Sequence, residues 1–180
     1  MTFYGLLLGL AVAELFSGFA RILQERTPPR LGLILPMLGM IVLIELIATF
    51  IDAWNSQQGV AIALQQLIVP TAVALAYFSV SAILVPRHFA DWPDLDAYFD
   101  LRRTWIIGLL LVANLLLVVV VLSVMSNRDA LIAYALRCAW LIGSYAVLLM
   151  SRRRWIDIAA ASSVIAFYAF TYIVRGIIWG

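Results

Sequence analysis

The stretch from Val85 to Trp105, VPRHFADWPDLDAYFDLRRTW, is the one long polar interval in this 180-residue chain. It holds four of the ten acidic residues, three of the twelve arginines and the single histidine. Apolar segments flank it on both sides, three before it and three after it. The stretch therefore divides a strongly apolar chain into two halves.

The composition predicts an integral membrane protein. Hydrophobic residues make up 65% of the chain, charged residues only 12%, and the mean hydropathy is +1.04. A soluble domain is roughly half apolar and a quarter charged, and a small domain buries only about two-thirds of its surface. Lipid must cover the remaining apolar surface. The net charge of +2 is too small to indicate a nucleic-acid partner.

Six segments are long enough to cross a bilayer, which takes about 20 apolar residues in a helix. Their short connections predict antiparallel neighbours, and hence an all-α up-down bundle in a single domain. A short interfacial helix is expected within the central loop, residues 85–104. The predicted spans are residues 2–23, 31–54, 59–84, 105–125, 130–150 and 155–179.

The arginines predict the orientation of the chain. Nine of the twelve fall in the first, third and fifth connections, and cytoplasmic loops carry the basic excess. Both termini are therefore expected on the periplasmic side of a bacterial inner membrane. All basic residues are arginine, which is typical of a GC-rich bacterial genome.

The central loop suits an amphipathic helix with Asp91 as its N-cap. Leu95, Tyr98 and Phe99 share one face with Arg102, and this face is expected to lie among lipid headgroups. A divalent-cation site is the alternative, since oxygen ligands suit calcium or magnesium, but the spacing matches no established loop and no metal is predicted. The loop residues of interest, also for docking of a cytoplasmic partner, are His88, Asp91, Asp94, Asp96, Tyr98, Asp100, Arg102 and Arg103.

Charged residues inside the spans form a first predicted layer. Glu45 lies nine residues before Trp54, about 13 Å from the outer edge, while Arg137 and Gln66 lie about 10 Å from it. We expect a buried Glu45–Arg137 ion pair with Gln65 or Gln66 beside it. The pair either fixes helix register or forms a pocket for an ion, a proton or a small ligand.

A second polar layer is expected nearer the cytoplasm. Glu14 and Asn114 lie about 10 to 14 Å from the inner edge by the same count. No arginine matches Glu14 at that depth. We therefore expect it either to be protonated or to bond Asn114.

Catalytic motifs are missing from the sequence. It contains no HExxH, GxSxG, CxxC or glycine-rich phosphate loop. No catalytic residue, metal ligand or cofactor is predicted, and an enzyme is unsupported although not excluded.

Three landmarks carry a resemblance: GFARILQ at the end of the first segment, LVP followed by DAYFDLRRTWIIGLL at the centre, and SRRRW before the last segment. The chain resembles an uncharacterised group of small six-helix bacterial inner-membrane proteins. The resemblance implies six helices and no particular activity or substrate. We expect a structural or partner-binding subunit of a membrane assembly, or a homo-oligomer; the alternative is a small channel, transporter or sensor that uses the buried polar layer.

Overall fold

The computed structural model describes residues 2–27, 29–56, 64–89, 91–92, 94–124 and 128–179, and side chains within 3–27, 29–54, 68–89, 91–92, 94–119 and 134–172. These residues form six α-helices and no strand, which confirms the all-α prediction. The helices are α1 (Thr2–Gln24), α2 (Ile34–Ser56), α3 (Leu64–Leu84), α4 (Leu95–Val124), α5 (Arg128–Met150) and α6 (Arg154–Trp179).

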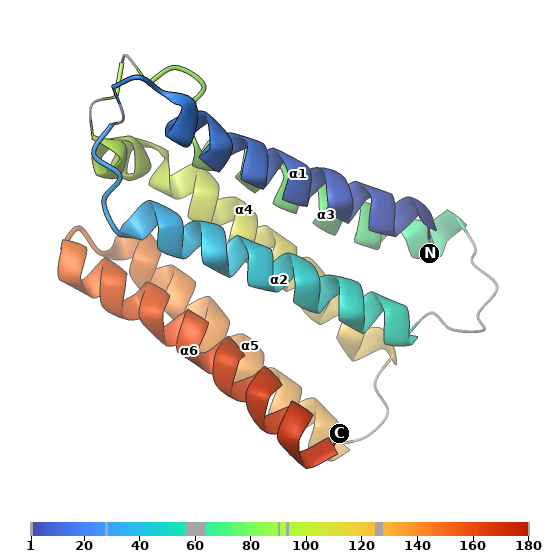
Figure 1. The fold of residues 1–180 in the computed structure, drawn as a ribbon. Coiled ribbons are helices and arrows are strands. Elements are labelled where there is room, and N and C mark those ends of the chain that lie inside the picture. Colours follow the sequence, from blue (N-terminus) through green and yellow to red (C-terminus); the bar gives the residue numbers. More distant parts are fainter. Residues whose placement is uncertain are drawn as a thin grey trace.

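The helices form two layers of three (Figure 1). One layer contains α1, α2 and α6, and the other contains α3, α4 and α5, with α1 on α3, α2 on α4 and α6 on α5. Consecutive helices run in opposite directions, so the chain has the expected up-down course. The two sequence halves are interleaved, since α2 packs on α6 and α3 packs closely on α4.

Helix α2 is the centre of the bundle. It packs against α1, α3, α4 and α6. In its most apolar 18-residue stretch, 56% of the residues are buried, against 22 to 28% in the corresponding stretches of α1, α4 and α6. A helix that is apolar all round is suited to such a position. Its residues Ile34, Leu38, Ile41 and Val42 are all 0% exposed.

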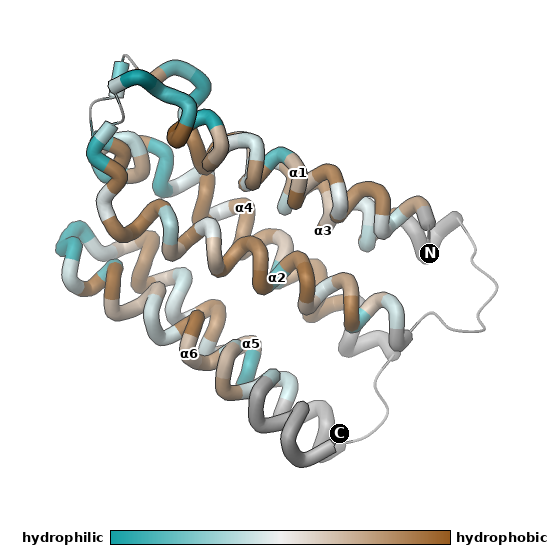
Figure 2. The backbone as a smooth tube through the Cα atoms, in the orientation of Figure 1, coloured by the Kyte–Doolittle hydropathy of each residue, from teal (hydrophilic) through white to brown (hydrophobic). Residues whose placement is uncertain are grey.

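Four helices are long and apolar enough, within the described residues, to cross a membrane: α1, α2, α4 and α6. The described apolar parts of α3 and α5 are shorter, Ile68–Leu84 and Tyr134–Met150. Apolar residues cover the helix shafts, and hydrophilic residues gather at the end where α1 stops and α2 begins (Figure 2). Apolar helices with polar residues gathered at one end fit a multi-pass membrane protein. Helices suit a membrane because their backbone polar groups bond within the helix.

The central stretch differs from the prediction of a separate interfacial helix. Residues from Leu95 onward are the first turns of α4, which continues without a break for 30 residues. Asp94, and not Asp91, caps this helix, because its Oδ1 accepts the backbone N–H of Asp96 at 2.9 Å. The face predicted to contact lipid packs on protein instead: Leu95 and Phe99 are 0% exposed.

The turn between α1 and α2 holds the beginning of α4 in place. The backbone N–H of Leu95 donates to the carbonyl of Arg30 at 3.1 Å. Gly32 has a positive φ of 60°, and a Cβ there would overlap the Asp96 carboxylate. Glycine meets both demands, since it alone adopts this backbone region without a steric penalty and has no side chain.

Candidate functional site

Glu45 lies halfway along α2 and is buried, with 1% of its surface exposed. Its carboxylate accepts hydrogen bonds from three tyrosine hydroxyls. Tyr145 donates to Oε1 at 2.5 Å and Tyr168 to the same atom at 3.2 Å, while Tyr77 donates to Oε2 at 3.2 Å. We call these residues, together with Asn114, the Glu45 cluster.

The fourth donor is the Asn114 side-chain amide. Its Nδ2 lies 3.2 Å from Oε1 and 3.3 Å from Oε2 of Glu45, and also 3.0 Å from the carbonyl of Leu110 one turn earlier. The donors come from α3, α4, α5 and α6, while Glu45 comes from α2. One carboxylate therefore joins five of the six helices.

The chemistry of the cluster suits an acceptor at its centre. A carboxylate offers about four lone-pair sites, and each phenol or amide N–H fills one of them. Tyr77, Tyr145 and Tyr168 are themselves buried, at 1%, 0% and 3% exposure, so each hydroxyl needs a partner inside the protein. Glu45 supplies that partner for all three.

The predicted Glu45–Arg137 ion pair is wrong. No ion pair of Glu45 occurs among the described side chains. The Arg137 guanidinium instead lies over the ring of Tyr168, 5.5 Å from its centroid. Arg137 therefore has an aromatic ring as its partner, through a cation–π contact, in place of the predicted carboxylate. Gln65 and Gln66 lie outside the described side chains.

Of the two alternatives predicted for Glu14, the bond to Asn114 is wrong. Asn114 belongs to the Glu45 cluster, and Glu14 is half-buried on α1. Helix α1 does not pack against α4 in the described part of the chain. The two predicted polar layers are therefore replaced by one cluster around Glu45.

A second polar cluster lies at the hydrophilic end of the bundle. The Arg103 guanidinium forms a two-pronged bond with Asp157, Nη1 to Oδ1 at 2.9 Å and Nη2 to Oδ2 at 2.6 Å. It also donates to the carbonyls of Leu148, at 2.8 Å, and Ser151. Arg103 is 8% exposed and Asp157 is 1% exposed. This buried pair ties α4 to α6 and to the turn before it.

The other residues of the central stretch are divided between this cluster and the surface. Asp100 binds Arg103 at 2.7 Å and Arg154 at 3.0 Å, and Asp96 lies 3.6 Å from Arg154. The Tyr98 hydroxyl donates to the carbonyl of Ile83 at 2.6 Å. The side chains of His88, Asp91, Asp94 and Arg102 are exposed.

The alternative of a cation site in this stretch finds no geometric support. Within the described residues, no three His, Cys, Asp or Glu side chains come together in a group that would hold a metal ion. Asp96 and Asp100 face arginines instead. We therefore interpret Asp96 and Asp100 as ion-pair partners, and Asp94 as the cap of α4.

Sequence reasoning missed the three tyrosines of the Glu45 cluster. It considered only charged and amide side chains, whereas the donors here are mostly phenols. A signal was present: tyrosine is enriched at membrane interfaces, so a tyrosine in the middle of an apolar span implies a buried acceptor.

Comparison with protein-family models, curated proteins and solved structures finds no match to this chain.

Proposed function

We propose that this chain is a multi-pass protein of a bacterial inner membrane, with both termini in the periplasm, that serves as a structural or partner-binding subunit of a membrane assembly. The proposal rests on one observation, that the buried Glu45 carboxylate has all its hydrogen-bond partners within the protein. Its carboxylate receives bonds from four helices at 1% exposure. Because these hydrogen bonds use the carboxylate, the cluster fixes the positions of the helices and leaves the carboxylate no open position for a substrate.

The remaining architecture supports the same proposal. Nearly all described residues lie in helices, and the connections are short. The cavity described below lies at the hydrophilic end and is lined by no residue of the Glu45 cluster. A chain with so little mass outside its helices acts through what its helices contact.

Native mass spectrometry tests the proposal. The chain, expressed at its natural level and extracted in a mild detergent, is expected in a complex of fixed stoichiometry, heavier than its own 20.0 kDa. Isolation as a monomer under all gentle extraction conditions would contradict the proposal. Dissociation by high detergent provides the control for a specific assembly.

A proton-responsive sensor or transporter is the second candidate. Its support is that Glu45 is an acid at mid-span with no cationic partner among the described side chains, and ionisable residues in membrane spans commonly mark functional sites. Protonation would turn the carboxylate from an acceptor of four bonds into a donor, and at least one of its partners would have to turn or move.

Proteoliposomes with an entrapped pH-sensitive dye separate the two candidates. The subunit proposal predicts that wild type and Glu45→Gln give the same slow proton leak as empty vesicles. Proton flux in wild type that Glu45→Gln abolishes would favour the second candidate. Glu14→Gln is the matched control, because it removes another acid from a predicted span outside the cluster.

A further inference from the structure

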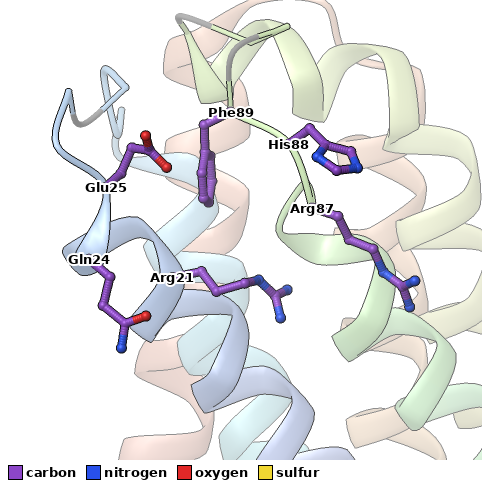
Figure 3. Close-up of a pocket in the computed structure, with 6 residues that line it drawn as sticks. All are labelled: Arg21, Gln24, Glu25, Arg87, His88 and Phe89. Atoms are coloured by element: carbon purple, nitrogen blue, oxygen red, sulfur yellow. The ribbon is translucent and has the colours of Figure 1, made fainter.

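A cavity opens at the hydrophilic end of the bundle, between the end of α1 and the segment that follows α3. Its volume is about 350 Å³. Figure 3 shows the Arg21 side chain extending toward the side on which Arg87 and His88 lie, while Gln24 extends away. The lining residues are Arg21, Gln24, Glu25, Arg87, His88 and Phe89.

Two guanidinium groups line the cavity without a direct ion-pair partner. Neither Arg21 nor Arg87 forms an ion pair within the described residues. Glu25 also lines the cavity, but it forms no ion pair with either arginine. Arg103 and Arg154 at the same end of the bundle bind aspartates. What sets Arg21 and Arg87 apart from the other arginines without an ion pair is that they line one cavity together.

Arg21 also has an unused donor. Its Nη1 donates to the Ser17 hydroxyl at 3.3 Å, but its Nε is buried without a hydrogen-bond partner. A guanidinium presents several N–H donors in a fixed plane, which suits the oxygens of a phosphate group. Two such groups and an imidazole around one cavity are the chemistry of a phosphate site.

We propose that this cavity binds the phosphate of an anionic phospholipid headgroup. A free phosphate offers the same oxygens, but the surroundings favour lipid. Leu23 precedes the lining residue Gln24 in the sequence and is 87% exposed. A large exposed apolar side chain at the same end of α1 as the cationic cavity matches the junction of headgroup and acyl chain. Basic pockets between membrane helices on the cytoplasmic side commonly hold such headgroups. The proposal rests on the membrane placement proposed above and not on the subunit role.

Lipid titration in native mass spectrometry tests this site. The full chain, in neutral detergent, is titrated with phosphatidylglycerol, with phosphatidylcholine or with inorganic phosphate. We expect one tightly retained phosphatidylglycerol per chain, at least tenfold weaker retention of phosphatidylcholine, and no displacement by millimolar phosphate. Equal retention of the two lipids, or displacement of phosphatidylglycerol by free phosphate, would overturn the lipid assignment.

Matched variants locate the site. Arg21→Gln combined with Arg87→Gln is expected to weaken phosphatidylglycerol retention at least tenfold. The control pair Arg102→Gln with Arg153→Gln removes the same charge from exposed arginines outside the cavity and should change retention less than twofold. An equal loss of phosphatidylglycerol retention in the two double variants would mean that only net charge matters, and would overturn the proposed site.

Arg87→Gln alone is the safeguard against misfolding. Arg87 is exposed, so its loss should leave the melting temperature unchanged while retention falls at least threefold. Unchanged retention in this variant would contradict the proposal. A six-pass topology established by labelling stays valid whichever lipid result is obtained, so failure of this site is distinguishable from failure of the membrane placement.

Discussion

Glu45 connects five of the six helices, because its side chain on α2 accepts hydrogen bonds from α3, α4, α5 and α6. Replacing it by alanine removes the Glu45 acceptor from three phenols and one amide, of which the amide keeps the carbonyl of Leu110. Each buried polar group left unsatisfied costs about 1–3 kcal/mol. Part of this cost is recovered when the tyrosines find other partners, as polar groups in membrane proteins often do.

We therefore expect Glu45→Ala to lower the free energy of unfolding by about 2 kcal/mol or more, and Glu45→Gln by about 1 kcal/mol, because the amide oxygen still accepts. Reversible unfolding in mixed micelles measures both. Glu14→Ala is the control, since Glu14 is half-buried outside the cluster. A Glu45→Ala variant as stable as wild type would show that the cluster is not structural.

The sequence identified Glu45 but not its partners, for a geometric reason. Counting residues placed Glu45 about 13 Å from one membrane edge and Asn114 up to about 14 Å from the other. In a hydrocarbon core about 30 Å thick, these two positions nearly coincide. The residues were assigned to separate layers although the count was too coarse to separate them. Rise per residue also says nothing about which helices are neighbours, so Arg137 was given the wrong partner.

At the scale of helices, the Arg103–Asp157 pair holds the first turns of α4 against α6. Breaking a buried pair from one side leaves an uncompensated charge, which costs about 3–5 kcal/mol. We expect that loss in the free energy of unfolding for Asp157→Leu, and a smaller loss for the double variant Arg103→Leu with Asp157→Leu. Denaturant titration measures it.

The neighbouring Arg102 provides the control for this pair. It is exposed, so Arg102→Leu should change stability by no more than about 0.5 kcal/mol. A double variant less stable than Asp157→Leu alone would contradict the interpretation of the pair as one buried unit.

The turn between α1 and α2 gives a second test at this scale. Gly32→Ala introduces a side chain at positive φ and against Asp96, so we expect a loss of about 1–3 kcal/mol. Gly108→Ala is the matched control, because nothing lies within 4 Å of the added carbon inside α4, and alanine favours a helix by about 0.5–1 kcal/mol. Thermal melts of both variants measure the difference. Equal melting temperatures would mean that the turn does not constrain α4.

The beginning of α4 shows what periodicity alone leaves open. The sequence predicted the apolar face of Leu95, Tyr98 and Phe99, and this face exists. Its partner was predicted to be lipid. The Tyr98 hydroxyl instead donates to the carbonyl of Ile83, and the backbone N–H of Leu95 donates to the carbonyl of Arg30. The periodicity of an amphipathic helix predicts that its apolar face is covered. Whether protein or lipid covers it depends on the tertiary arrangement.

At the scale of the whole molecule, the sequence was sufficient for six helices and their alternating direction, because apolar length and short connections determine both. It did not predict the two layers or the central place of α2. In a membrane, similar apolar helices can be arranged in several orders at similar cost, since lipid is as apolar as the helix surfaces. The polar clusters select one order by requiring particular partners.

Orientation is a testable property of the whole chain. In a Cys138→Ser background, an impermeant maleimide added to intact cells in which the periplasm is accessible should label Gln58→Cys, between α2 and α3. Asp91→Cys, between α3 and α4, should react only after the inner membrane is permeabilised, because the arginine-rich connections are expected in the cytoplasm. The reverse labelling pattern would contradict the proposed orientation.

The central claim is that phenols, and not a guanidinium, hold the Glu45 carboxylate. Double-mutant cycles on unfolding in mixed micelles compare Glu45→Leu with Tyr145→Phe and Glu45→Leu with Arg137→Leu. Residues in direct contact couple by about 0.5–3 kcal/mol. We predict a Glu45–Tyr145 coupling in that range and a clearly smaller Glu45–Arg137 coupling, transmitted only through Tyr168. A Glu45–Arg137 coupling larger than that of Glu45–Tyr145 would contradict the account.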